Sequence, residues 1–181
     1  MRNYQEQLYL GPMPGSTEPL SSWLEDVRTN GITLVICLTP PHEIEKKSPE
    51  YARLLNDWTL TASTTVAESP SAPPPDSTPA GSSQVDTDSH PEVIQLAVGD
   101  NQAPEDPAAF WKAVESTAAH TKAGGKAFIH CRGGRGRTGL FAAAVLMQQG
   151  KSAEEALAAI KPAGSYPESA DQQAFLRRAP L

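Results

Sequence analysis

The chain has 181 residues, of which 39% are hydrophobic and 20% charged, and its formal net charge is −6. That length is enough for one domain with its own core, so we expect residues 1–181 to form a single domain. The acidic balance argues against nucleic-acid binding and against stable association with anionic membranes, since both need a basic surface.

The N-terminal residues lack the apolar core of a signal peptide, and the longest strongly apolar run, residues 140–147, is too short to span a membrane. Two cysteines, Cys37 and Cys131, are too few for a disulfide scaffold or a zinc site. We therefore expect a cytoplasmic, monomeric protein with no metal and no cofactor.

The predicted elements of the first half are, in chain order, a strand over residues 8–10, a helix over 20–29, a strand over 32–38 and a helix over 49–57. Gly31 is the C-terminal stop of the first helix. The run 32–38 is apolar without a break, which is typical of a strand buried on both faces.

Residues 59–92 differ in composition from the rest of the chain. They contain no Lys or Arg, five acidic residues and many Ser, Thr and Pro. Such a segment buries too little surface to offset its ordering entropy, so we expect a disordered acidic insertion within the domain. It is either a regulatory loop or a tolerated surface insertion, and the small entropic cost of long loops favours the second. The rest of the chain is close to neutral.

The predicted elements of the second half are a strand over 93–98, a helix over 107–121, a strand over 126–130 and helices over 137–149, 153–161 and 169–177. Asp106 before Pro107 is typical of a helix N-terminus. Short strands separated by helices predict an α/β fold with a small, mostly parallel central sheet and helices on both faces. Ligands bind such folds at the C-terminal end of a central strand, and His130 ends the strand 126–130.

The most distinctive segment follows His130, where residues 131–139 read Cys-Arg-Gly-Gly-Arg-Gly-Arg-Thr-Gly. Between a strand and a helix, such a loop lets backbone N–H groups converge on an anion, and the helix N-terminus adds a positive dipole. The same dipoles and cations favour the thiolate form of Cys131. Arg137 offers a planar fork that matches two phosphate oxygens. The sequence therefore predicts a nucleophile beneath an anion site.

The loop is neither a Walker motif nor a dinucleotide fingerprint. The pattern C-x5-R-[ST], preceded by His130, resembles the signature of cysteine-dependent protein tyrosine phosphatases at every position from 130 to 139. The chain is small and looks like the dual-specificity group, particularly the cyclin-dependent-kinase-associated phosphatases and their bacterial relatives. This resemblance implies a dual-specificity phosphatase-like fold. It also implies hydrolysis of phosphotyrosine, and of phosphoserine or phosphothreonine, through a phosphocysteine intermediate, so a phosphorylated protein is the expected partner.

The resemblance also implies roles for the loop residues. Cys131 would attack phosphorus, and Arg137 would bind the phosphate oxygens and stabilise the transition state. Thr138 would hydrogen-bond the sulfur and ease its departure, and His130 would hold the loop and tune the thiol. The remaining loop residues would bind the substrate phosphate: Arg132, Gly133, Gly134, Arg135 and Gly136.

The leaving oxygen needs a proton donor from outside the loop. Asp100 follows the predicted strand 93–98, and its place resembles the mobile acid loop of dual-specificity phosphatases. Asp106 is the rival, although helix capping explains it more simply, and Asp57 would serve only if the insertion shifted the chain. Gln172 and Gln173 resemble a late glutamine that orients the hydrolytic water in this branch. An exposed polar helix face would explain both glutamines equally well.

Three alternatives remain open. Arg132 and Arg135 fill positions that are basic in phosphatase-and-tensin-type lipid phosphatases, so a phosphoinositide or inositol polyphosphate phosphatase with the same mechanism is the runner-up. A rhodanese-type sulfurtransferase also places a cysteine before an arginine-rich glycine loop, but it would not need Arg137-Thr138-Gly139. A non-catalytic phospho-binding module would keep the loop without needing Cys131.

Cys37 lies near the end of the predicted strand 32–38, at the sheet edge to which His130 also leads. Some relatives have a second cysteine that traps the oxidised nucleophile as a disulfide. Cys37 is therefore a redox candidate, and a small buried core residue is the equally weighted alternative.

Overall fold

The structure is a computed structural model that describes residues 2–4, 7–64 and 90–180. Its strands are β1 (Arg2–Tyr4), β2 (Leu8–Gly11), β3 (Leu34–Cys37), β4 (Glu92–Gln95) and β5 (Ala127–His130). Its helices are α1 (Leu20–Asn30), α2 (Pro41–Lys47), α3 (Pro49–Thr64), α4 (Pro107–Lys122), α5 (Gly136–Gln148), α6 (Ala153–Ile160) and α7 (Ala170–Arg177), with a 3₁₀ turn over Lys161–Ala163.

The strands form one sheet in the order β1-β2-β5-β3-β4. The pairs β2–β5, β5–β3 and β3–β4 are parallel, and β1 pairs antiparallel with β2. His130, at the end of the central strand β5, lies opposite Gly11 of β2 and Cys37 of β3. The carboxyl ends of the parallel strands thus meet at one edge of the sheet, and this confirms the predicted mostly parallel α/β architecture.

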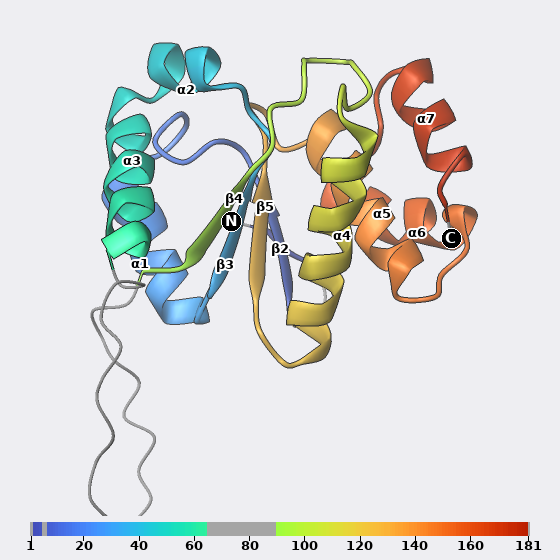
Figure 1. The fold of residues 1–181 in the computed structure, drawn as a ribbon, viewed down its shortest axis with the longest axis horizontal. Helices are drawn as coiled ribbons and strands as arrows, with labels where there is room; N and C mark the ends of the chain where they lie inside the picture. Colours follow the sequence, from blue (N-terminus) through green and yellow to red (C-terminus); the bar gives the residue numbers. More distant parts are fainter. Residues whose placement is uncertain (1, 5–6, 65–89, 181) are drawn as a thin grey trace, which may run out of the picture.

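Helices cover both faces of the sheet (Figure 1), with α1 and α3 on one side and α4 and α5 on the other. Alternate strand residues point to opposite faces. Val35 and Phe128 pack with Trp23 of α1 and Tyr51 of α3 in one core, whereas Ile36 joins the core beneath the helices of the second half of the chain. Because both faces are buried, the central strands have no polar side, as their unbroken apolar run predicts.

The helix caps follow the sequence closely. Gly31 ends α1 in the left-handed conformation with φ 66°, and the Asp106 side chain accepts a hydrogen bond from the Ala109 N–H at the start of α4. Ser152 and Glu155 form a reciprocal capping box on α6. These local signals predicted α1, α4 and α6 to within a few residues.

Two elements were not predicted. The short strand β1 depends on pairing with β2, and α2 begins at Pro41, in a stretch for which the sequence analysis predicted no element. Proline is tolerated at the first helical position because the N–H it lacks has no intrahelical partner there. The structure therefore adds a helix directly after β3.

The predicted bounds of the insertion, 59–92, were wrong at both ends. The backbone of α3 continues to Thr64, because extending a helix costs far less than starting one, and Glu92 begins β4. Residues 65–89, on which the rest of the prediction falls, lie outside the described residues.

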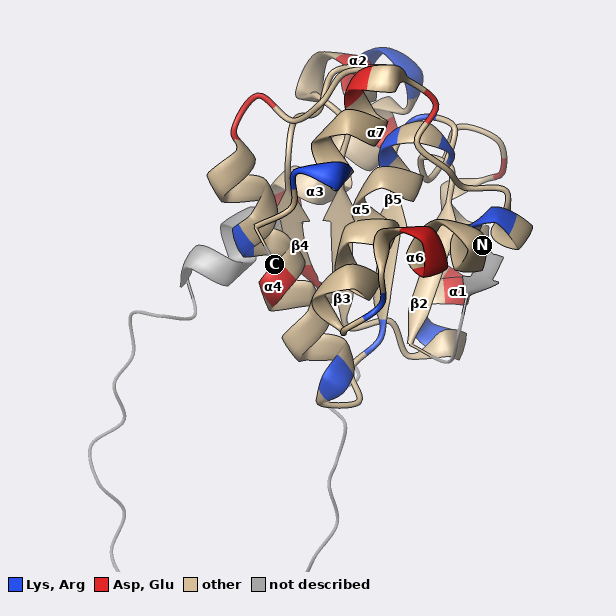
Figure 2. Cartoon of the chain, turned by 90° about the vertical axis from the view of Figure 1, so that its right-hand side faces the viewer, with Lys and Arg blue, Asp and Glu red and all other residues tan. Residues whose placement is uncertain are grey.

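Charged residues of both signs are interspersed around the end of the molecule that carries α2 and α7 (Figure 2). Within the described ranges, no helix combines the length and apolar character needed to cross a membrane.

Candidate active site

The loop between β5 and α5, residues 131–135, is held in place through its carbonyl oxygens. The Met13 N–H donates to the Arg132 carbonyl at 3.1 Å, and the buried Ser165 hydroxyl donates to the Gly134 carbonyl at 2.8 Å. Gly134 has φ 68°, and a Cβ there would overlap the backbone of Gly11 at the end of β2. Only glycine fits this position, because it needs both a left-handed backbone and a close approach.

The helix α5 begins at Gly136 and is almost fully buried. Its first N–H groups have no intrahelical acceptor, so they form an anion-binding end beside the loop. A Cβ on Gly136 would come within 2.6 Å of Glu168 Oε2, which shows how closely the neighbouring segment approaches. The predicted cradle of loop and helix N-terminus is therefore present.

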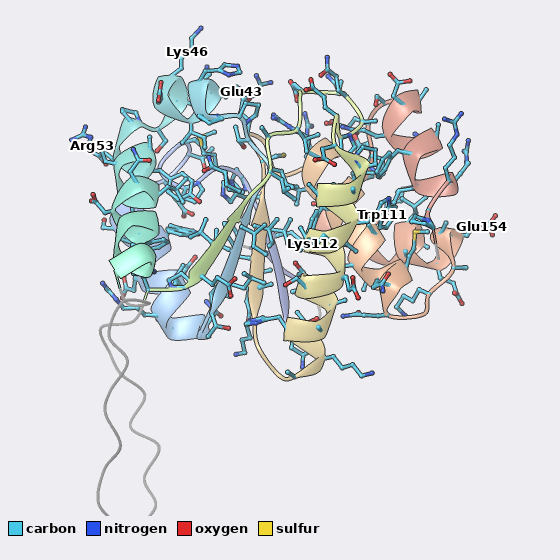
Figure 3. All side chains as sticks on the ribbon, viewed as in Figure 1. Glu43, Lys46, Arg53, Trp111, Lys112 and Glu154 are labelled. Carbon is cyan, nitrogen blue, oxygen red and sulfur yellow. The ribbon has the colours of Figure 1, made fainter. Side chains whose placement is uncertain are left out.

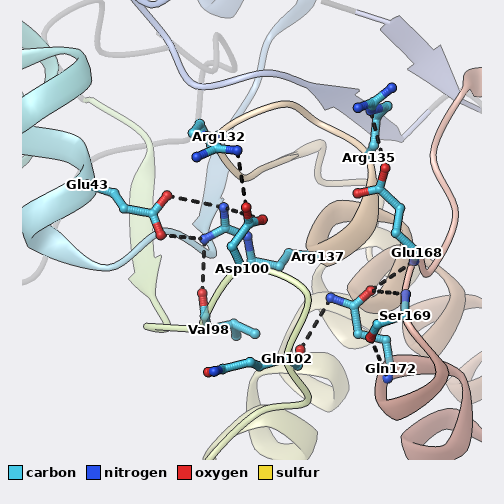
Figure 4. A network of polar contacts seen from close by, with 10 residues as sticks. All are labelled: Glu43, Val98, Asp100, Gln102, Arg132, Arg135, Arg137, Glu168, Ser169 and Gln172. Atoms are coloured by element: carbon cyan, nitrogen blue, oxygen red, sulfur yellow. Dashed lines mark hydrogen bonds and ion pairs between the residues drawn. The ribbon is translucent and has the colours of Figure 1, made fainter.

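Arg137 lies in the first turn of α5, and its side chain is 1% exposed. Its Nη1 donates to the Val98 carbonyl at 3.0 Å and to Glu43 Oε1 at 3.2 Å, and its Nη2 donates to Glu43 Oε2 at 3.2 Å. The Nη2 atom also lies 3.2 Å from Asp100 Oδ1 (Figure 4). The Nε atom is buried without a hydrogen-bond partner, which leaves one N–H of the fork available.

Glu43 is a site residue that the sequence analysis missed. It projects from α2 toward the site, whereas Lys46 of the same helix points to solvent (Figure 3). Its two oxygens bind the two terminal nitrogens of Arg137 in a bidentate pair, which fixes the plane of the guanidinium. The available signal was an acidic residue shortly after a buried strand that ends at the same sheet edge as β5.

Asp100 lies at the same edge, after β4. Its Oδ2 accepts a hydrogen bond from Arg132 Nη2 at 3.1 Å, so its carboxylate faces two guanidiniums. Asp106 caps α4 instead, and Asp57 lies within α3. The geometry therefore favours Asp100 over both rivals as the carboxylate beside the loop.

A pocket of about 200 Å³ brings five of the predicted residues together: Asp100, Cys131, Arg132, Gly133 and Arg135. Its lining residues are Asp100, Asn101, Cys131, Arg132, Gly133, Arg135 and Glu168. Cys131 is 3% exposed at its base, and the exposed residues Arg132, Gly133 and Arg135 form part of the rim. Arg135 Nε lies 3.4 Å from Glu168 Oε1.

His130 and Thr138 lie beneath the loop and are fully buried. His130 Nε2 and the Tyr51 hydroxyl share a hydrogen bond of 2.7 Å. Burial lowers the pKa of His130 to about 3, against a smaller opposing effect of the Cys131 backbone, and Arg137 lowers it further, so the ring is neutral. The Thr138 hydroxyl has no hydrogen-bond partner, so the predicted contact with the sulfur is not formed in this structure.

The two glutamines have different surroundings. Gln172 is fully buried, so the interpretation as an exposed polar face was wrong for this residue. Its Oε1 accepts from the Glu168 N–H at 2.9 Å, and its Nε2 donates to the Gln102 carbonyl at 3.3 Å, which ties α7 to the loop that carries Asp100. Gln173 is exposed and donates to the Pro167 carbonyl.

Cys37 and Cys131 are both free thiols. Cys37 packs in the core beneath α1 and α3, whereas Cys131 belongs to the core on the other face. Burial raises the pKa of Cys37 to about 12, with Cys131 as a weaker cause in the same direction. Cys37 is therefore a fully buried, protonated thiol that packs in a different core from Cys131.

Comparison with solved structures identifies the fold. Kinase-associated phosphatase, with its catalytic-site cysteine replaced by serine, aligns with a TM-score of 0.66 at 19% identity over 93% of this chain and 83% of that one. Tk-PTP in its active form aligns with a TM-score of 0.62 at 20% identity, over 94% of this chain and 89% of that one. Human DUSP28 aligns with a TM-score of 0.59 at 17% identity, over 98% of this chain and 94% of that one. These likenesses establish a dual-specificity phosphatase-like fold.

A search of curated proteins found no match. A family model described as Swiss Army Knife protein, DSP-PTPase phosphatase domain, matches residues 15–180, which is nearly the whole chain. The chain therefore belongs to this PTP-SAK family of DSP-PTPase domains, and it is a cysteine-dependent phosphatase of the dual-specificity superfamily.

Proposed function

We propose that the chain is a cytoplasmic, monomeric phosphatase that hydrolyses phosphomonoesters on proteins, phosphotyrosine foremost, through a phosphocysteine formed on Cys131. The observation that carries this proposal is the single pocket lined by Cys131, Asp100 and two loop arginines. A nucleophile, a proton donor and an anion cradle at one sheet edge are what phosphoryl transfer to a cysteine needs.

In the first step, the Cys131 thiolate attacks phosphorus and forms the S–P bond. The P–O bond to the leaving group breaks, and protonated Asp100 gives its proton to the departing oxygen. Arg137 and the N–H groups at the start of α5 bind the remaining phosphate oxygens as their charge shifts. Without that proton, a poor leaving group would depart as an unstable alkoxide.

In the second step, water attacks the phosphocysteine and Asp100, now ionised, takes a proton from it. The S–P bond breaks, inorganic phosphate leaves, and the thiolate is restored, so no net oxidation occurs. We assign Glu43 a positioning role, because its bidentate pair with Arg137 holds the guanidinium plane. Gln172 positions the loop that carries Asp100 through its bond to Gln102.

Hydrolysis of p-nitrophenyl phosphate by the wild type and two variants tests the mechanism. Cys131→Ser should lower kcat by a factor on the order of 10³ or more, because the hydroxyl is a far weaker nucleophile. Arg137→Lys should lower it about 100-fold, since an ammonium cannot reproduce the fork. EDTA should have no effect, because the loop supplies the positive charge itself.

The matched control is Arg53→Lys, an exposed position on α3 that points away from the site (Figure 3) and should leave kcat unchanged. Trapping of phosphate on Cys131 by rapid acid quench and mass spectrometry reports the intermediate directly. Substantial turnover in Cys131→Ser would refute the mechanism.

A further inference from the structure

In addition to Arg137, which the proposed reaction uses, two loop arginines lie at the rim of the pocket. Arg132 and Arg135 have side chains that are 50% and 62% exposed, and their positions would suit a second phosphate on the substrate. Each of them nevertheless faces a carboxylate from another segment. Arg132 Nη2 lies 3.1 Å from Asp100 Oδ2, and Arg135 Nε lies 3.4 Å from Glu168 Oε1 (Figure 4).

The fold places the Glu168 carboxylate at this rim. The Glu168 N–H donates to Oε1 of the buried Gln172 at 2.9 Å, and Ser165, three residues earlier, is bonded to the Gly134 carbonyl. Glu168 Oε2 lies over Gly136, where even one added methyl group would come within 2.6 Å of it. The backbone that carries Glu168 is therefore held on both sides, and its carboxylate lies beside the N-terminal end of α5.

The charges around the pocket balance. The two arginines that line it, Arg132 and Arg135, and the buried Arg137 behind it form ion pairs with three carboxylates: Glu43, Asp100 and Glu168. One phosphate can be held by the buried N–H groups at the base of the pocket. A second phosphate would lie at the rim beside Glu168 and would have to displace it from Arg135, so like-charge repulsion opposes it.

We propose that Glu168 is a specificity-determining residue that, by pairing with Arg135, restricts this site to substrates with a single phosphate group near the reacting centre. The inference rests on the proposed function and deepens it. It favours singly phosphorylated substrates over the phosphoinositides and inositol polyphosphates that the arginine-rich loop alone suggests.

The test compares kcat/KM for two peptides that differ only in a phosphoserine beside the phosphotyrosine. The measured quantity is the ratio of the doubly to the singly phosphorylated peptide, which should be below one in the wild type. Glu168→Gln should raise this ratio about three- to tenfold, because one negative charge at the rim is removed. Adding Arg135→Gln to Glu168→Gln should reverse the gain, and about 1 M salt should shrink it.

The matched control is Glu115→Gln. Glu115 lines a separate groove with Gln7 and Gln149 at the opposite end of the sheet, so its loss should leave the ratio unchanged. An unchanged ratio in Glu168→Gln, an equal gain in Glu115→Gln, or a wild-type ratio above one would overturn the proposal.

Binding separates this inference from the proposed reaction. Calorimetry on Cys131→Ser measures its affinities for inorganic phosphate and for pyrophosphate without turnover, and their ratio gives the preference for one or two phosphate groups. Glu168→Gln in that background should strengthen pyrophosphate binding about three- to tenfold more than phosphate binding. If neither anion gained, the specificity proposal would fail even with an active enzyme. If the gain appeared without any turnover in the wild type, only the proposed reaction would fail.

Discussion

At the residue scale, Asp100 faces two guanidiniums and shares the pocket with Cys131. If it is the proton donor, Asp100→Asn should lower kcat about 100-fold for alkyl phosphates and much less for p-nitrophenyl phosphate. The reason is that a leaving group of low pKa barely needs the proton. Steady-state kinetics over a series of substrates measures how kcat depends on the pKa of the leaving group in the wild type and in Asp100→Asn.

Asp106→Asn is the matched control for Asp100. Asp106 caps α4, and asparagine caps a helix about as well as aspartate, so neither stability nor kcat should change much. A larger loss of kcat in Asp106→Asn than in Asp100→Asn would show that Asp100 is not the proton donor.

Glu43 is the other residue whose role can be isolated. Glu43→Gln removes one charged oxygen from the bidentate pair with the buried Arg137. We expect kcat to fall roughly tenfold to 100-fold with a smaller change in KM, because a misaligned fork stabilises the transition state less well. Glu45→Gln, an exposed position on the same helix, is the control, and equal effects of the two variants would remove the positioning role.

At the scale of elements, the register of β3 against β5 sets Cys37 opposite His130, one residue before Cys131. Burial raises the pKa of Cys37 to about 12, so nearly all of it is the unreactive thiol at neutral pH. After mild peroxide, we therefore expect a Cys37–Cys131 cross-link to form slowly near pH 7. Its rate should increase about tenfold per pH unit as the thiolate fraction increases.

Mass spectrometry of peptides from oxidised protein measures this cross-link. Cys37→Ser should keep basal activity and recover poorly when thiol is added after peroxide, because its nucleophile oxidises further. Full recovery of that variant would show that Cys37 is a core residue without a redox role.

At the scale of the whole molecule, the buried neutral His130 links stability to pH. Its pKa is about 3 when folded and near 6.5 when unfolded, so the unfolded chain binds more protons between these values. The free energy of unfolding should therefore fall as pH falls from about 6.5 toward 3, by about 1.4 kcal/mol per pH unit from this residue.

Urea denaturation between about pH 7 and pH 5 measures that dependence. His130→Asn should be less stable near neutral pH, since Tyr51 loses its ring partner, and its stability should depend less on pH. If the free energy of unfolding of His130→Asn depended on pH as steeply as that of the wild type, His130 would not be the source of the acid sensitivity.

Much of the site was predictable because its chemistry is contiguous in the chain. Residues 130–139 contain the strand end, the glycine loop, Cys131 and Arg137, and strand–loop–helix geometry follows from local backbone preferences. The position of Asp100 at this edge was predictable as well, because parallel strands bring their carboxyl ends to one edge. Local caps likewise predicted α1, α4 and α6.

The rest depended on tertiary structure, since no local pattern marks its partners. Glu43 pairs with Arg137 across 94 positions, and Gln172 reaches Gln102 across 70. The strand β1 exists only through pairing with β2, and Glu168 matters only because packing carries it to the loop rim. The sequence by itself determined the family and the class of reaction and predicted the nucleophile, because these depend on a short local motif. Only the tertiary structure decided which carboxylates face which arginines, because that depends on side chains brought together by packing from distant segments.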